Sequence, residues 1–142
     1  MNELHARISR SFASQGFMTT LGAVLEHVEE GEVRIALAPS THVAQQHGYV
    51  HAGAIGSILD SACGYAALTK APGGFEVVTA EFKINLLRPA IGSRFLAIGK
   101  VVNAGRQLTV CSGEVRAFSP ESPQGKVVAL MQATIVNVAG AA

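Results

Sequence analysis

The stretch that decides the fold is residues 52–69, AGAIGSILDSACGYAALT, in which Asp60 is the one charged residue. Its large apolar residues recur at helical spacing, as Ile55, Ile58 and Leu59 show, and they predict one apolar helix face. The opposite face carries small residues and a single carboxylate: Gly53, Ser57, Asp60, Gly64 and Ala67. A helix that is apolar or small on every side is typical of a buried helix. We therefore expect this segment to form the centre of the fold.

The sequence around this helix predicts a sheet. The spacing of Leu4, Ile8 and Phe12 first indicates a short amphipathic helix at residues 3–14. Apolar and alternating residues then indicate strands, two before the central helix and four after it: residues 17–28, 32–37, 75–87, 94–102, 107–118 and 126–138. This order predicts one α+β domain over residues 1–142, in which an antiparallel sheet wraps a long central helix.

The strand expected at residues 75–87 follows Pro72-Gly73-Gly74, which ends the helix. Strict alternation places four of its residues on one face: Ala80, Phe82, Ile84 and Leu86. It places four others on the opposite face: Thr79, Glu81, Lys83 and Asn85.

The composition narrows the class of protein. Of 142 residues 49% are apolar and 15% are charged, and the net charge is +1, which gives no field that would attract nucleic acid or an anionic membrane. No apolar run is long enough for a membrane span, and the start Met1-Asn2-Glu3 lacks the features of a secretory signal, so we expect a cytoplasmic protein. So few charges cover a monomer poorly, which favours a subunit interface. Cys63 and Cys111 lack paired spacing and predict buried free thiols.

Several common site motifs are missing from the sequence. His42, His47 and His51 precede the central helix, but they lack zinc-site spacing and a cysteine or second carboxylate partner, so we expect no metal. Gly56-Ser57 does not form a nucleophile elbow, and no P-loop lysine follows Gly73-Gly74.

The strongest chemical signal is the start of the central helix, at Ala52 and Gly53, together with Asp60. The first amides of a helix lack intrahelical partners and lie at the positive end of its dipole. Small residues there allow a ligand carbonyl to approach, as in an oxyanion hole. The side-chain amides of Gln45 and Gln46 offer a second donor.

Helix geometry separates these two features. Asp60 lies about 12 Å along the helix axis from Ala52, so it cannot act on a carbonyl held at its own helix start. A second helix running in the opposite direction would bring the two together. If Asp60 is catalytic, the protein is therefore at least a dimer with shared sites. A structural role, in which Asp60 is bonded to a neighbouring amide or hydroxyl, explains it equally well from chemistry alone.

Three features together resemble the hotdog-fold acyl-CoA thioesterases, and within them the phenylacetate-degradation (PaaI-like) group. They are QQHGYVHAG at residues 45–53, Asp60 seven residues later, and TAEFKINLLRP at residues 79–89. The similarity covers roughly residues 17–138. It implies the hotdog fold, with a long central helix wrapped by a curved antiparallel sheet. It also implies hydrolysis of an acyl-CoA thioester to free acid and coenzyme A.

The resemblance also implies roles for residues. Asp60 is the nucleophile or the general base for water, and the family does not decide which. The helix-start amide of Ala52, beside Gly53, polarises the thioester carbonyl. Gln45 stands where relatives have asparagine, and Thr79 supplies the hydroxyl that positions water.

The resemblance further implies that coenzyme A is part of the substrate and that no separate cofactor is needed. Residues of the matching segments and basic residues for the phosphates are expected to bind the substrate: Gly48, His51, Lys83, Arg88, Pro89 and Arg106. The resemblance also implies a homodimer or homotetramer with sites shared between subunits. It does not identify the acyl group of the substrate.

Two other functions compete with this one. Hotdog hydratases and dehydratases pair a catalytic histidine with an acid, but no proline follows His47 or His51 where their loop motif requires it. A non-catalytic acyl-CoA binding module has no need of a carboxylate beside a thioester. The joint presence of Asp60, Gln45 and Thr79 favours the thioesterase.

Overall fold

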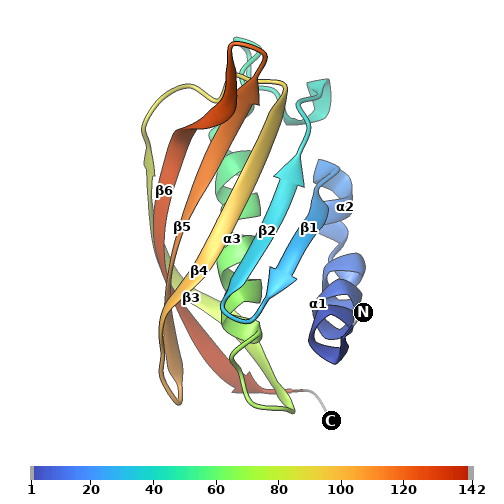
Figure 1. Cartoon of the computed structure of the whole chain (residues 1–142), viewed down its shortest axis with the longest axis vertical. Helices are drawn as coiled ribbons and strands as arrows, with labels where there is room; N and C mark the ends of the chain where they lie inside the picture. The colour runs from blue at the N-terminus through green and yellow to red at the C-terminus, as the bar shows by residue number, and fades with distance from the viewer. Residues whose placement is uncertain (1, 141–142) are drawn as a thin grey trace.

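The computed structural model describes residues 2–140 and contains one six-stranded antiparallel sheet that curves around a long helix (Figure 1). The elements in chain order are α1 (Glu3–Ser14), α2 (Gly16–Leu21), β1 (Val24–Glu29), β2 (Glu32–Leu37), the short 3-10 helix η1 (Thr41–Val43), α3 (Ala52–Leu68), β3 (Phe75–Leu86), β4 (Arg94–Ala104), β5 (Leu108–Ser119) and β6 (Ser122–Ala139). The strand order is β1-β2-β4-β5-β6-β3, so β3 forms one edge of the sheet, beside β6. The predicted α+β architecture is confirmed.

Two of the expected strands differ from the observed elements by more than two residues. Residues 17–28, expected as a strand, divide into α2 and β1, because Gly22 adopts a left-handed conformation (φ 76°) that ends the helix. The last strand begins at Ser122, four residues before the expected start, and only a two-residue turn separates it from β5. Pro120 and Pro123 made this segment look like a longer loop, but Ser119 and Ser122 pair and extend the hairpin.

The apolar face of α3 packs on the concave side of the sheet. Ile55, Ile58 and Leu59 are at most 1% exposed. A Cβ atom at Gly99 of β4 would stand 2.4 Å from the backbone of Ala62, so only glycine allows the helix to approach this closely. The small-residue face of α3 is less buried than the apolar face, because the chain itself covers Ser57, Asp60 and Gly64 only partly. The expectation of a helix buried on every side is therefore wrong for a single chain.

A β-bulge at Ala80 changes the faces of β3. Thr79 pairs with Ile135 of β6, but Glu81 pairs with the adjacent Thr134, so Ala80 is an extra residue in β3. The bulge directs Thr79 to the same face as Phe82, toward α3. The alternation expected from the sequence placed Thr79 on the other face with Glu81, and that placement is wrong because the extra residue shifts the period by one.

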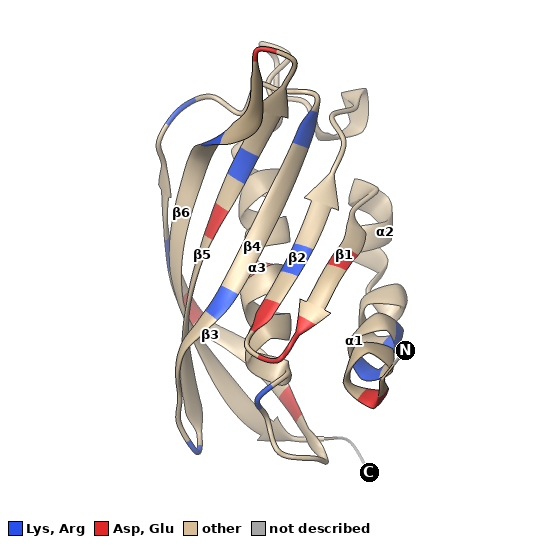
Figure 2. Cartoon of the chain, viewed as in Figure 1, with Lys and Arg blue, Asp and Glu red and all other residues tan. Residues whose placement is uncertain are grey.

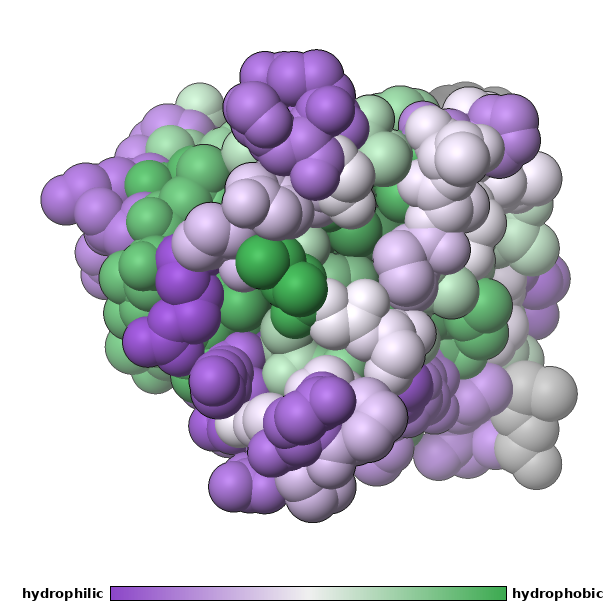
Figure 3. All heavy atoms as spheres, turned by 90° about the horizontal axis from the view of Figure 1, so that it is seen from above, coloured by the Kyte–Doolittle hydropathy of each residue, from purple (hydrophilic) through white to green (hydrophobic). Residues whose placement is uncertain are grey.

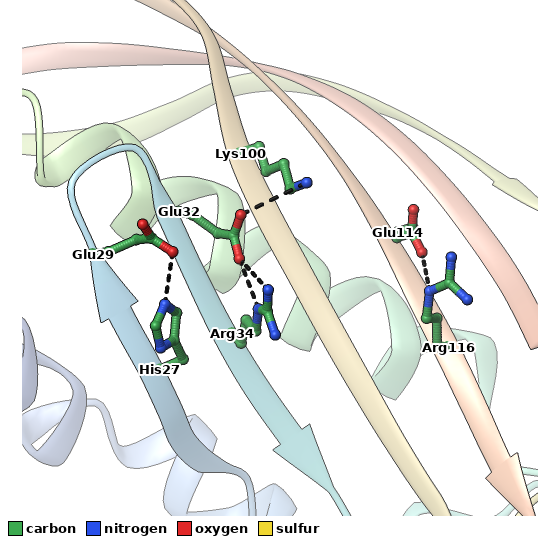
Figure 4. Close-up of polar contacts among 7 residues, drawn as sticks. All are labelled: His27, Glu29, Glu32, Arg34, Lys100, Glu114 and Arg116. Atoms are coloured by element: carbon green, nitrogen blue, oxygen red, sulfur yellow. Dashed lines mark hydrogen bonds and ion pairs between the residues drawn. The ribbon is translucent and has the colours of Figure 1, made fainter. Parts of the chain in front are cut away.

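Several charged residues of the strands form ion pairs on the convex face of the sheet (Figures 2 and 4). In each of three strands, residues two apart pair with each other: His27 with Glu29, Glu32 with Arg34, and Glu114 with Arg116. His27, Glu29 and Glu32 together have the spacing of metal ligands, but Glu32 already pairs with Arg34 and with Lys100 at 3.7 Å. These contacts make the cluster an ion-pair network. No helix within residues 2–140 is long and apolar enough to cross a membrane.

Candidate active site

Asp60 projects from the partly covered face of α3. Its Oδ1 accepts a hydrogen bond from Thr79 Oγ1 at 2.8 Å, a contact that the bulge at Ala80 makes possible. Burial raises the pKa of the Asp60 carboxyl, and the hydrogen bond from Thr79 lowers it again in part. The structure therefore brings together the carboxylate and the hydroxyl that the family resemblance placed in one active site.

A polar pocket of about 200 Å³ lies around this carboxylate, between the N-terminal helices, α3 and β3. We call it the Asp60 pocket, and its lining residues are Ser11, Gln15, Asp60, Ser61, Gly64, Tyr65, Leu68, Glu76, Val77 and Thr79. Four of them form a hydrogen-bonded network. Ser61 Oγ donates to Gln15 Oε1 at 3.3 Å, and the Tyr65 hydroxyl accepts from Gln15 Nε2 at 3.0 Å and from Ser11 Oγ at 3.2 Å.

Sequence reasoning missed this network. Ser61 and Tyr65 follow Asp60 on α3 and are one helical turn apart, which is a weak signal. Ser11 and Gln15 come from a distant part of the chain that no motif connects to α3.

At its N-terminus α3 begins with His51 as the cap. The His51 Nδ1 atom accepts a hydrogen bond from the Gly53 amide at 2.7 Å. Within residues 2–140, no acceptor takes the amide N–H of Ala52. Of the two amides that the sequence pointed to, Ala52 is thus the free donor and Gly53 is already engaged.

The loop before the helix is held by Gln45. Its Oε1 accepts from the amides of His47 and Tyr49, around a turn in which Gly48 has a positive φ of 85°. Gly48 therefore shapes the loop, because other residues rarely adopt this conformation. The Nε2 end of Gln45 donates to no group in the described part of the chain.

A second and larger pocket, about 490 Å³, lies at this helix start. We call it the helix-start pocket, and it is lined by Gln45, Gln46, Tyr49, Val50, His51, Ala52, Ile55, Leu86, Arg88, Pro89, Ala90 and Val128. Arg88 also donates to the carbonyl of Val127 at 2.9 Å. Figure 3 looks onto this end of the molecule and shows apolar surface between hydrophilic side chains.

Two predicted substrate-binding residues lie elsewhere in the chain. Lys83 is on the face of β3 that points away from α3, since it pairs with Gln132 while its neighbours Phe82 and Ile84 pair with the inward residues of β6. Arg106 is in the turn between β4 and β5, at the other end of the sheet from the start of α3 (Figure 1). A single chain does not bring them to the helix-start pocket.

The two pockets share no lining residue. Asp60 and Thr79 line one, while Ala52 and Gln45 line the other. Asp60 lies eight positions after Ala52 on α3, about 12 Å along the helix. One chain therefore holds the two halves of the predicted site apart, as the helix geometry required.

Comparison with known proteins defines the family. The curved antiparallel sheet around one long helix is the hotdog fold, and the sequence profile of the thioesterase superfamily matches residues 47–123, more than half of the chain. The chain belongs to the thioesterase superfamily.

Solved structures agree with this assignment. A thioesterase family protein from Silicibacter pomeroyi is 39% identical, with a TM-score of 0.92 over 96% of this chain and 99% of that chain. A variant of the phenylacetic acid degradation protein PaaI from Thermus thermophilus is 28% identical, with a TM-score of 0.75 over 87% of this chain and 100% of that chain. The resemblance to the PaaI-like group is confirmed.

A curated relative from Saccharolobus solfataricus, provisionally named an esterase, is 33% identical over 92 residues. The match covers 63% of this chain and 59% of that protein. The chain thus spans less than two thirds of the length of this relative.

Proposed function

We propose that the protein is an acyl-CoA thioesterase whose active sites are completed by a second copy of the chain. The observation that carries the proposal is the hydrogen bond between Asp60 and Thr79 on the partly covered face of α3. The start of the same helix leaves the amide of Ala52 without an acceptor within residues 2–140. Two such helices running in opposite directions would bring Asp60 of one copy to the Ala52 amide of the other. Membership in the thioesterase superfamily supports the proposal.

The chemistry follows from the donors and the carboxylate. The thioester carbonyl oxygen accepts from the Ala52 N–H, and the positive end of the α3 dipole stabilises the oxyanion that develops there. Gln45 Nε2 is the second donor in reach of the same pocket. Coenzyme A enters as part of the substrate, and Arg88 at the rim of the helix-start pocket is the cation best placed for its phosphates.

Asp60 has two possible roles. As a general base it takes a proton from water while the water oxygen attacks the carbonyl carbon, and the intermediate collapses with loss of the coenzyme A thiolate, which accepts the proton. As a nucleophile it forms an anhydride and releases the thiolate, and water then hydrolyses the anhydride. In both routes the carboxylate is the active form, and Thr79 holds it in place.

A hydratase requires a histidine beside the acid. Within residues 2–140 the partner of Asp60 is Thr79 and not a histidine, and His51 Nδ1 accepts from the Gly53 amide, so the contacts of a single chain favour the thioesterase.

The test is thiol release from a panel of aromatic, short-chain, medium-chain and long-chain acyl-CoA substrates. Wild-type protein should hydrolyse at least one class, and Asp60→Asn should abolish that hydrolysis. Glu114→Gln is the matched control, because it removes a carboxylate from the convex face, and it should keep full activity. Wild-type turnover by Asp60→Asn would contradict the mechanism. If the wild-type protein hydrolysed none of the substrates, a binding module would be favoured instead.

A further inference from the structure

The hydrogen-bonded network beside Asp60 has no part in the mechanism described so far. Its members line the Asp60 pocket and are Ser11, Gln15, Ser61 and Tyr65. Within residues 2–140 none of them forms a hydrogen bond to the Asp60 carboxyl, which accepts from Thr79. The network therefore surrounds a cavity next to the reacting carboxylate with polar groups that the hydrolysis itself does not use.

Gln15 and Tyr65 are held firmly in this network. Gln15 lies between α1 and α2, where it caps the end of one helix and the start of the other, and its backbone N–H donates to the Phe12 carbonyl at 3.1 Å. The ring centroid of Tyr65 lies 6.1 Å from that of Phe12, and Tyr65 is only 6% exposed. Polar groups that are already fixed bind a ligand at little cost in ordering. Both side chains are therefore suited to select a ligand by its hydrogen bonds.

The position of the cavity assigns it to the acyl group of the substrate. In the proposed function the thioester carbonyl lies between the Ala52 amide of one copy and Asp60 of the other, so the two arms of the substrate run into the two pockets. The helix-start pocket is the larger, at about 490 Å³, and it holds Arg88, which suits the long coenzyme A arm with its phosphates. The Asp60 pocket, at about 200 Å³, is left for the acyl group.

The size and the lining of the Asp60 pocket limit the kind of acyl group. A water molecule in the liquid occupies about 30 Å³, so 200 Å³ has room for roughly seven heavy atoms of this size and not for a long chain. Of the ten lining residues seven have polar side chains, and only Leu68 and Val77 offer large apolar ones. Two apolar side chains give little contact for the faces of an aromatic ring. The pocket therefore fits a short aliphatic acyl group with a polar substituent.

The unused hydrogen-bonding capacity of the network identifies this substituent. The Tyr65 oxygen accepts from Gln15 Nε2 and from Ser11 Oγ, and no acceptor within residues 2–140 takes the Tyr65 hydroxyl proton. Gln15 Oε1 accepts one bond, from Ser61 Oγ at 3.3 Å, and has a second lone pair. One donor and one acceptor together match a hydroxyl group. The Asp60 carboxylate in the same pocket disfavours an acyl group that ends in a second negative charge.

We propose that Gln15 and Tyr65 bind the hydroxyl of a short aliphatic hydroxyacyl group in the Asp60 pocket. Tyr65 donates to the hydroxyl oxygen, and Gln15 Oε1 accepts a hydrogen bond from the same hydroxyl. Tyr65 lies five positions after Asp60, about 7.5 Å along α3, which places the hydroxyl on the third or fourth carbon. An unsubstituted acyl group leaves this donor and this acceptor without a partner. The proposal rests on the proposed function, because the shared site decides which arm of the substrate enters the pocket.

Matched substrates test the selection. For the wild-type protein, kcat/KM for 3-hydroxybutyryl-CoA or 4-hydroxybutyryl-CoA should exceed that for butyryl-CoA by at least about tenfold. Tyr65→Phe and Gln15→Met each remove one hydrogen-bonding group and keep the size of the side chain, so each should lower this ratio toward one. Gln132→Met, at an exposed position of β6, is the matched control and should keep the wild-type ratio. A wild-type ratio near one, or a preference for phenylacetyl-CoA over both hydroxyacyl substrates, would overturn the proposal.

A structural role of the network gives a different result. If the network only anchors the N-terminal helices to α3, Tyr65→Phe and Gln15→Met should lower the Tm and leave the substrate ratio unchanged. That outcome would overturn the proposal.

Binding without turnover separates the hydroxyl site from the proposed function. Calorimetric titration of Asp60→Asn with the same thioesters should show tighter binding of the hydroxyacyl substrates than of butyryl-CoA. If the wild-type protein hydrolyses none of them but this binding preference is found, the proposed function fails and the hydroxyl site stands. Hydrolysis without any preference for a hydroxyl would overturn the hydroxyl site and leave the proposed function standing.

Discussion

At the scale of single residues, the candidate site depends on how Thr79 tunes Asp60. The carboxylate form is active, so kcat/KM should rise with pH as Asp60 ionises. Thr79→Val keeps the shape of the side chain but removes the hydrogen bond that favours the charged form. The pKa of Asp60 should then rise, the acidic limb of the pH–rate profile should move to higher pH, and the rate should fall by roughly 10- to 100-fold. An unchanged profile would mean that Thr79 does not act through Asp60.

The same carboxylate should reduce the stability of the fold at neutral pH. Because burial raises its pKa in the folded state, the stability gained by protonation is fully present below the unfolded pKa and is lost as the pH rises through the folded pKa. Asp60→Asn has the same shape and no charge, so it should have a higher Tm than the wild type near pH 8, with the difference shrinking toward acid pH. Thermal unfolding across this range measures the effect. A lower Tm for the variant near pH 8 would show that the charge is compensated.

Both cysteine thiols should be unreactive in the folded protein. Burial raises the pKa of Cys111 to about 12 and raises that of Cys63 as well, and the Cys111 thiol donates to the Cys63 carbonyl at 3.4 Å. A maleimide should therefore leave both thiols unmodified in the native protein and modify both in denaturant, as mass spectrometry would show. Rapid labelling of the native protein would indicate that the contact between α3 and β5 opens readily.

At this scale, the sequence predicts best those features that depend on residues close together in the chain. Asp60 and Ala52 lie on one helix, so their separation follows from the rise per residue alone. The orientation of Thr79 depends on a bulge that is visible only in the pairing of β3 with β6. The contacts of Tyr65 with Ser11 and Gln15 join segments fifty or more positions apart, and nothing in the local pattern indicates them.

At the scale of elements, the close approach of α3 to the sheet is the feature most sensitive to substitution. A Cβ at Gly99 would stand 2.4 to 2.5 Å from backbone atoms of Ala62 and Cys63, which cannot move without shifting the helix. Gly99→Ala should therefore lower the free energy of unfolding by about 1–3 kcal/mol in urea titration. Gly16→Ala is the control, because nothing lies within 4 Å of its Cβ position, and it should not destabilise. Equal stability of both variants would contradict the packing argument.

Most helices and strands were predictable because each has its own regular spacing of apolar residues. The central helix and β2 begin where the pattern placed them, since apolar spacing and turn residues mark those boundaries. The segment that became α2 and β1 has no clear period, so only the structure shows that Gly22 divides it. The early start of β6 depends on the pairing of Ser119 with Ser122, and Pro120 and Pro123 made the same residues look like a loop in the sequence.

At the scale of the whole molecule, the separation of the two half-sites allows a test that uses two inactive variants. Asp60→Asn removes the acid from its own copy. Ala52→Pro removes the helix-start N–H, and proline is well accepted at the first position of a helix, here after His51 with an extended backbone. Each variant alone should form dimers without thioesterase activity.

Mixing the two variants and allowing subunits to exchange should restore activity. In a mixed dimer, the Ala52→Pro copy supplies Asp60 and Thr79 while the Asp60→Asn copy supplies the free amide, so one of the two sites is intact. Random exchange makes about half of the dimers mixed, each with one working site, so activity should reach about a quarter of the wild-type value. A site built within one chain gives no recovery at any mixing ratio. Recovery near a quarter, seen only after exchange, would require that the acid and the amide come from different copies.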